Sequence, residues 1–365
     1  MQLELSEEQE LFATSLREWI AAKFTTETVR RLQSDGDTST FTAALINEGW
    51  WAVGYPEQAG GQGGGVLELA LTAREFGRAA VPDASWLAAT VAAPLLTDAE
   101  LAAQIEGEQR YALALRGDRI PDWSAVESDR GCLSGTVAHV LGAPEADVFL
   151  VPVEGGLARL SAEAVTVSAE PLLDRSRAAG TIEFAEVAVT DVQAVDDAAL
   201  VRATALAAVL VAADALGAAE RMLELSVEYS KQRKQFGRPI GSFQAVKHAA
   251  AQMLVSVEAA YSIALYAAAA LDGGRPDATT TAAAAKAQVT GGAVGVADSA
   301  LTVHGAIGYT WEHDLHLFYK RAKLDRTLFG TPRAWNERIA TALLDETAIP
   351  RRPFGPFSTD TTELM

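Results

Sequence analysis

The chain has 365 residues, 49% of them hydrophobic, and a formal net charge of −18, so it can bury a large core but repels polyanions such as nucleic acid. Because Cys132 is the single cysteine, the chain cannot form an internal disulfide, which fits a reducing cytoplasm. We interpret Cys132 as a small core residue. The acidic residues 1–10 do not resemble a signal peptide and the most apolar run, 205–213, is too short to span a bilayer, so we expect a cytoplasmic protein without a membrane contact.

Residues 1–107 have the pattern of a helical domain. Ser6 and Gln9 form a capping-box pair, and apolar residues then recur at helical spacing. The glycine-rich segment 54–65 precedes a helix predicted over 66–78. It lacks the Gly-Lys-Ser/Thr ending of a phosphate loop, so we interpret it as a connection between helices.

Residues 108–196 change character. Short runs rich in valine, leucine and aromatic residues alternate with turns that contain Gly, Pro and Asp, and these runs lie at 111–115, 147–153, 157–160 and 181–189. Because no helical pattern separates the runs, they predict a small antiparallel β domain.

Residues 197–348 return to the helical period and predict an alanine-rich bundle. One apolar stripe runs from Phe243 to Ala268, and another helix begins near Ala278. Gly291, Gly292 and Gly295 lie inside that helix, where close approach of a neighbouring helix would offset their low helix propensity. The proline-rich residues 349–365 are expected to be poorly ordered or docked on a partner. The predicted class is α+β, mainly α.

The segment 229–244, YSKQRKQFGRPIGSFQ, concentrates basic residues around one aromatic ring in an otherwise acidic chain. Lys231, Arg233, Lys234 and Arg238 surround Phe236 between two predicted helices. Guanidinium groups bind phosphate oxygens in a bidentate manner and stack on flat rings, so this segment indicates a nucleotide cofactor. A glycine-bearing turn, TVHGAIGYTW, follows at 302–311.

The order of helices, β domain and bundle, together with these two segments, resembles the acyl-CoA dehydrogenase family of flavoproteins over nearly the whole chain. The family pattern R-K-x-F-G, with a glutamine eight positions after the Phe, is matched by Arg233, Phe236 and Gln244. The turn HGAIGYT is similar to the family's H-G-G-x-G-Y-T segment.

The resemblance implies an FAD that lies across a subunit boundary. Arg233 would contact the pyrophosphate, Phe236 would pack against the cofactor, and Gln244 would donate or accept a hydrogen bond near it. Thr302 to Gly305 would add backbone contacts. The alternative is that Arg233 forms a surface ion pair and Phe236 belongs to the core.

The parts of the family pattern that serve a subunit's own flavin ring are missing. The family's catalytic glutamate precedes a Gly-Thr pair, and Phe329 occupies that position before Gly330 and Thr331. A phenyl ring cannot accept a proton. A second family position for the base falls near Ala207, in an apolar run. The T-E-P-type segment has no match after residue 114, and His139 and Val140 stand near the place of a Trp-Ile-Thr segment.

This asymmetry leads us to interpret the chain as a non-catalytic subunit of a heteromeric acyl-CoA dehydrogenase of the kind that actinobacteria use in steroid degradation. A second, fuller subunit would supply the base and bind most of the acyl-CoA. An electron-transfer flavoprotein would accept the electrons.

Two rivals remain open. A self-sufficient homotetrameric enzyme would need a relocated base, for which Asp325, Asp214 and Glu220 are candidates. Alternatively, the chain is a purely structural partner subunit. A metal site at His313 and His316 would need further ligands, and the sequence does not cluster another His or Cys there. A serine hydrolase is not indicated either, because the sequence has no G-x-S-x-G element.

Overall fold

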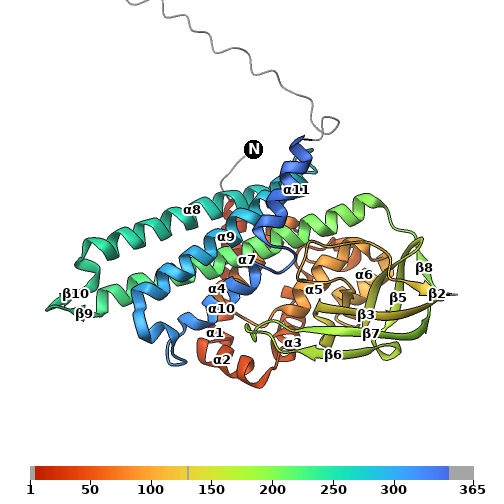
Figure 1. The fold of residues 1–365 in the computed structure, drawn as a ribbon, viewed down its shortest axis with the longest axis horizontal. Helices are drawn as coiled ribbons and strands as arrows, with labels where there is room; N and C mark the ends of the chain where they lie inside the picture. Colours follow the sequence, from red (N-terminus) through yellow and green to blue (C-terminus); the bar gives the residue numbers. More distant parts are fainter. Residues whose placement is uncertain (1–4, 130, 345–365) are drawn as a thin grey trace, which may run out of the picture.

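The computed structural model describes residues 5–129 and 131–344 (Figure 1). N-terminal helices, a middle β region and a C-terminal helical bundle follow one another along the chain, so the predicted α+β, mainly α class is confirmed. The division into 1–107, 108–196 and 197–348 stays a prediction. The residues 349–365 expected to form a tail lie outside the described residues.

The N-terminal part contains helices α1 to α6. Their bounds are α1 Glu7–Lys23, α2 Thr26–Asp35, α3 Ser39–Asn47, α4 Val66–Ala79, α5 Ala84–Ala92 and α6 Asp98–Ile105. The capping box at α1 is confirmed, because the Gln9 amide donates to Ser6 Oγ and the Ser6 amide donates to Gln9 Oε1. The glycine-rich segment connects the short 3-10 helix η1 (Trp50–Ala52) to α4, as predicted.

Within the described residues, two four-stranded sheets form the middle region. One has the order β1-β4-β5-β8, with bounds β1 Tyr111–Leu113, β4 Val148–Val153, β5 Gly156–Ser161 and β8 Val192–Gln193. The other has the order β2-β3-β7-β6, with bounds β2 Ser128–Asp129, β3 Cys132–Leu141, β7 Ala179–Ala188 and β6 Thr166–Glu170.

The predicted antiparallel arrangement is confirmed for the other strand pairs of the two sheets but is wrong for one, since β1 runs parallel to β4. Between these strands the chain passes through β2 and β3 of the other sheet and returns in the same direction, which is the long connection that a parallel pair needs. Cys132 is also not a core residue. It lies half-buried at the start of β3, and the neighbouring Leu133 is the one that points inward.

The C-terminal part contains helices α7 to α11, with bounds α7 Asp197–Gln232, α8 Gln244–Asp272, α9 Ala278–His304, α10 Leu315–Asp325 and α11 Pro332–Leu344. Helices α7, α8 and α9 lie side by side and pack against one another (Figure 1). Helices α7 and α8 are long and apolar enough to cross a membrane by length and composition, but 78% of the apolar window of α7 and 44% of that of α8 is buried inside the protein.

The prediction that another helix approaches the glycines of α9 closely is wrong within the described chain. A Cβ added at Gly292 or Gly295 would meet nothing within 4 Å, and one at Gly291 would meet only the Pro332 side chain at 3.9 Å. Helix α9 instead buries its alanine and valine face, for example Val289 and Val296.

Candidate functional site

A two-stranded hairpin between α7 and α8 lies within the basic segment and carries Lys234 and Arg238. Its strands are β9 Lys234–Gln235 and β10 Arg238–Pro239. Because Gln235 pairs with Arg238, the turn consists of Phe236 and Gly237, whose φ angles of +51° and +79° are typical of a type I′ turn. A left-handed conformation costs a non-glycine residue about 1–2 kcal/mol, and such local strain often marks functional positions.

The side chains of this hairpin point into solvent. Phe236 is 91% exposed, so the alternative that it belongs to the core is wrong. It contacts Phe243 edge-to-face, and the Arg238 guanidinium lies 4.2 Å from the centre of the Phe243 ring. Arg233 is exposed and has no carboxylate within ion-pair distance among the described residues. Gln244, the first residue of α8, is exposed as well.

The glycine-bearing turn lies beside the base of the hairpin. Helix α9 ends at His304, whose ring stacks on Tyr229 with centroids 4.6 Å apart, and Tyr229 comes one helical turn before Arg233. Thr302 is exposed and donates through Oγ1 to the Asp298 carbonyl, while Gly305 is exposed with a φ of +63°. The structure therefore brings the five predicted cofactor residues to the same end of the bundle.

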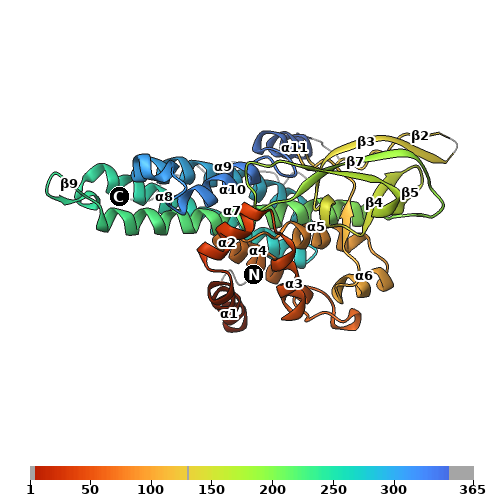
Figure 2. The ribbon, with the colours of Figure 1, turned by 90° about the horizontal axis from the view of Figure 1, so that it is seen from below.

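We call this group the bundle-tip corner; it comprises Arg233, Phe236, Gln244, Thr302 and Gly305. In both Figure 1 and Figure 2 the hairpin lies at the end of the molecule opposite the β sheets. The guanidinium group, the open aromatic ring and the exposed backbone of this corner suit the phosphates and adenosine of a dinucleotide.

The histidines considered as metal ligands have structural surroundings. The Leu315 amide donates to His313 Nδ1, and His316 is buried against the Trp311 ring, with centroids 4.8 Å apart. Residues 5–129 and 131–344 contain no group of three His, Cys, Asp or Glu side chains arranged to hold a metal ion.

His316 should make the folded protein sensitive to acid. Burial, reinforced by the Lys320 and Arg30 cations, lowers the pKa of His316 from 6.5 to about 4. Between those two pH values the unfolded chain binds a proton that the folded chain does not, so stability falls as the pH drops from 6.5 towards 4. We expect His316→Gln to reduce this loss in urea unfolding at pH 7 and pH 4.5. Equal losses in both proteins would contradict the assignment.

The position of the family's catalytic base contains a buried and firmly held Phe329. Its amide donates to the Gly117 carbonyl over 2.6 Å, and its carbonyl accepts from Trp335 Nε1 over 2.9 Å. Lys286 Nζ donates to the Asp325 and Gly330 carbonyls, at 2.9 Å each, and so holds both ends of this loop. Ala207, at the second position, is fully buried.

Beside this loop lies a cavity of about 130 Å³. It is lined by Gly117, Asp118, His139, Leu141, Leu172, Arg177, Ala179, Leu324, Thr327 and Leu328. Sites for drug-sized ligands usually enclose ~300–1,000 Å³, so this cavity is small for a tricyclic ring. At its rim His139 Nδ1 lies 2.5 Å from Glu170 Oε2, so a polar pair stands near the expected place of the Trp-Ile-Thr segment.

A buried cluster of charges lies next to the cavity, and sequence patterns did not predict it. Arg177 pairs with Asp83 at 2.7 Å, and Arg321 pairs with Asp83 at 2.9 Å and with Asp214 through Nε, also at 2.9 Å. Asp325 lies 3.5 Å from Arg177. These residues come from the loop before α5, the loop before β7, helix α7 and helix α10, so the cluster joins the N-terminal, middle and C-terminal parts of the chain.

Burial and the neighbouring charges shift the pKa values of the carboxyl groups in this cluster. Burial disfavours ionisation of Asp214, but Arg321 and Arg177 outweigh it and lower the pKa of that carboxyl. Burial and the neighbouring Asp214 raise the pKa of Asp325 well above its usual range. Burial also raises the pKa of Asp83, although Arg177 and Arg321 oppose that shift.

The three candidates for a relocated base are therefore engaged elsewhere. Asp214 and Asp325 belong to the buried cluster, and the Glu220 carboxylate accepts from Arg74 Nε at 3.0 Å. None of them lines the 130 Å³ cavity.

The bundle-tip corner and this cavity are separate regions of the chain. Arg177, which lines the cavity, pairs with Asp214 on α7. Arg233 follows Asp214 by 19 residues along α7, or about 28 Å at 1.5 Å per residue. The bundle-tip corner therefore does not border this cavity.

Comparisons with known proteins agree with this architecture. Residues 6–103 match the model of the acyl-CoA dehydrogenase N-terminal domain, and residues 198–344 match the model of the C-terminal domain. The chain is 33% identical over 310 residues to the acyl-CoA dehydrogenase IpdE2 of Mycobacterium tuberculosis, covering 83% of this chain and 86% of that protein. It is 36% identical over 305 residues to FadE34 of the same organism, covering 82% of this chain but only 41% of FadE34.

Among solved structures, the ChsE4-ChsE5 complex from Mycobacterium tuberculosis superposes with a TM-score of 0.85 at 26% identity, covering 96% of this chain and all of the matched chain. A variant of the Tcur3481-Tcur3483 steroid ACAD superposes with a TM-score of 0.84 at 27% identity, covering 94% of this chain and 99% of the matched chain.

Proposed function

Because the chain belongs to the acyl-CoA dehydrogenase family, whose cofactor is FAD, we propose that it is the non-catalytic subunit of a heteromeric acyl-CoA dehydrogenase. One observation carries the proposal. All five residues of the bundle-tip corner are exposed, whereas the chain's own base position contains Phe329 beside a cavity of about 130 Å³.

The described residues fit one half of FAD. Arg233 would hold the pyrophosphate, Phe236 would pack on the cofactor, and Gln244, Thr302 and Gly305 would add hydrogen bonds. When bound, FAD supplies the hydride acceptor for α,β-dehydrogenation of an acyl-CoA thioester. The reactive ring, the catalytic carboxylate and most of the acyl-CoA site belong to the partner subunit in this proposal.

The names of the similar proteins support a proposal about the partner subunit and the class of substrate. Two superposing structures are complexes of two differently named chains, and one of them is described as a steroid ACAD. We therefore propose a second acyl-CoA dehydrogenase subunit as the partner, a steroid-derived acyl-CoA as the substrate class, an electron-transfer flavoprotein as the acceptor, and the cytoplasm as the location.

The rival functions are less well supported. A self-sufficient homotetramer would need a free base, and Asp214, Asp325 and Glu220 are all engaged with arginines or buried. A purely structural subunit would have no need of an exposed Arg233 beside an exposed Phe236 in a strained turn.

The isolated chain should not reduce flavin with any acyl-CoA, and Phe329→Glu should not restore the reaction, because the cavity beside this loop is too small for the flavin ring. The measurement is anaerobic bleaching of flavin absorbance after addition of a steroid-derived acyl-CoA. The co-purified complex with the partner is the positive control. Bleaching by the isolated wild-type chain would support the self-sufficient enzyme instead.

A further inference from the structure

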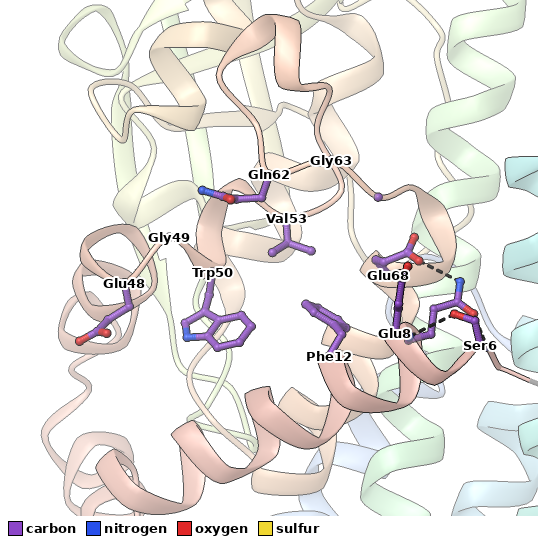
Figure 3. Close-up of a pocket in the computed structure, with 12 residues that line it drawn as sticks. Ser6, Glu8, Phe12, Glu48, Gly49, Trp50, Val53, Gln62, Gly63 and Glu68 are labelled. Atoms are coloured by element: carbon purple, nitrogen blue, oxygen red, sulfur yellow. Dashed lines mark hydrogen bonds between the residues drawn. The ribbon is translucent and has the colours of Figure 1, made fainter.

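Two cavities lie along helix α1, and their linings differ in charge. The first, of about 470 Å³, lies between α1, the short helix η1 and the glycine-rich segment that leads into α4, and its lining contains three glutamates and no arginine or lysine (Figure 3). The second, of about 430 Å³, is lined by Arg17, Arg78 and Arg221. Because the whole chain has a net charge of −18, three guanidinium groups around one cavity do not follow from its overall composition.

The three arginines of the second cavity come from three helices. Arg17 lies on α1, Arg78 on α4 and Arg221 on α7, and α4 packs against both of the other helices. Glu75 fixes the Arg17 guanidinium, since it accepts from Nε at 2.8 Å and from Nη2 at 2.7 Å. Arg78 and Arg221 pair with Glu224, which does not line the cavity. With Glu75 as the one carboxylate among the lining residues, the three guanidinium groups leave the lining a net charge of +2.

These ion pairs do not use all the donors of the three arginines. Within residues 5–129 and 131–344, Arg17 Nη1, Arg78 Nε and both Nε and Nη2 of Arg221 donate to no protein acceptor. Guanidinium groups with free N–H donors bind phosphate and carboxylate oxygens strongly. The second cavity therefore suits an anion.

The N-terminus of the ten-residue helix α2 lies at the same cavity. Thr25, its N-cap, and Thr26 belong to the lining, and Thr25 Oγ1 accepts from the Thr28 amide at 3.3 Å. The amides of Thr26 and Glu27 have no acceptor in the part of the chain that the structure describes. A helix N-terminus attracts negative charge, so it adds to the effect of the arginines.

Apolar side chains supply much of the remaining lining. Ile20, Phe24 and Phe318 line the cavity and are otherwise buried. A volume of about 430 Å³ lies within the ~300–1,000 Å³ that is usual for sites of small organic ligands. A phosphate monoester offers three terminal oxygens to three guanidinium groups, whereas a carboxylate offers two. The lining thus matches a phosphate group attached to an apolar body.

We propose that this cavity is a binding site for a small organic phosphate, with the phosphate held by the three arginines and the apolar part of the ligand packed on Phe24 and Phe318. The site is independent of the proposed flavin site. Arg221 precedes Arg233 by 12 residues of α7, or about 18 Å at 1.5 Å per residue, so a ligand between the three arginines does not need the bundle-tip corner.

Isothermal titration calorimetry of the full chain with phenyl phosphate tests the proposal. Wild type should bind phenyl phosphate at least about tenfold more tightly than inorganic phosphate, which lacks the apolar body, and than benzoate, which lacks the third oxygen. Equal affinity for phenyl phosphate and inorganic phosphate would mean that the apolar lining takes no part, and equal affinity for benzoate would mean that any anion is accepted. Either result, or no binding of phenyl phosphate, would overturn the proposal.

Single substitutions locate the bound ligand. Arg221→Ala should weaken phenyl phosphate binding at least about tenfold, and it should preserve the fold because that side chain is 30% exposed and pairs with Glu224 within the same helix. Arg31→Ala is the matched control, since Arg31 pairs with Asp35 on the surface of α2 and does not line the cavity. Equal weakening by both substitutions, or by neither, would contradict the site. Weakening by Arg233→Ala in place of Arg221→Ala would assign phenyl phosphate to the bundle-tip corner, which overturns this proposal and leaves the flavin site standing.

Discussion

Replacing Arg233 with alanine should raise the dissociation constant of FAD from the complex with the partner subunit by about 10- to 150-fold, which corresponds to ~1.5–3 kcal/mol. Arg233 is exposed at the C-cap of α7 and has no carboxylate partner in the described chain, so its guanidinium is free to bind phosphate. Equilibrium dialysis of the complex with FAD measures the change.

The effect should depend on position and not on charge alone. Arg333→Ala is the matched control, because that side chain is 88% exposed, pairs only with Glu337 on the surface of the described chain, and lies on α11 away from the bundle-tip corner. It should leave FAD binding unchanged. If both variants release FAD equally, the contribution of Arg233 is general electrostatics, and if neither does, Arg233 is not a phosphate ligand.

Replacing Arg321 with alanine should lower the free energy of unfolding by about 3–5 kcal/mol, because removal of one partner leaves buried carboxylates without compensation. Arg321 is completely buried and donates to Asp83 and Asp214, and it also donates to the Val81 carbonyl at 2.7 Å. Urea denaturation followed by circular dichroism provides the measurement.

The control for Arg321→Ala is a substitution at Arg326, about one helical turn further along the chain. Arg326 is exposed at the end of α10, and Arg326→Ala should change the unfolding free energy by less than about 0.5 kcal/mol. A loss below about 1 kcal/mol for Arg321→Ala would mean that water or a rearranged Arg177 compensates the cluster. The cluster would then not hold the three parts of the chain together.

Local sequence signals predicted the features that depend on neighbouring residues. The Ser6–Gln9 capping box, the start of α9 at Ala278 and strands β1, β4, β5 and β7 follow from short-range patterns of caps, turns and apolar periods, whereas β2, β3, β6 and β8 were not predicted. The exposure of Phe236 was not predicted, because the sequence left open whether this residue belongs to the core; in the structure it lies in a two-residue hairpin turn between the paired Gln235 and Arg238.

Features that depend on contacts between distant segments were not predictable in this way. The buried cluster combines Asp83, Arg177 and Arg321 from three parts of the chain, and its only local signal was Asp214 within an apolar run. The parallel pairing of β1 with β4 likewise depends on distant segments, because the chain passes through β2 and β3 of the other sheet before it returns to β4. The glycines of α9 were misread because helical spacing does not reveal which face meets a neighbour.

Flavin stoichiometry tests the central proposal most directly. The complex of this chain with its partner subunit is purified, denatured and assayed for released FAD by absorbance and for each chain by quantitative mass spectrometry. We predict one FAD for each pair of unlike chains, since only the partner provides a ring site and only this chain provides the bundle-tip corner. One FAD for every chain, or a full complement of FAD in this chain purified alone, would contradict the proposal.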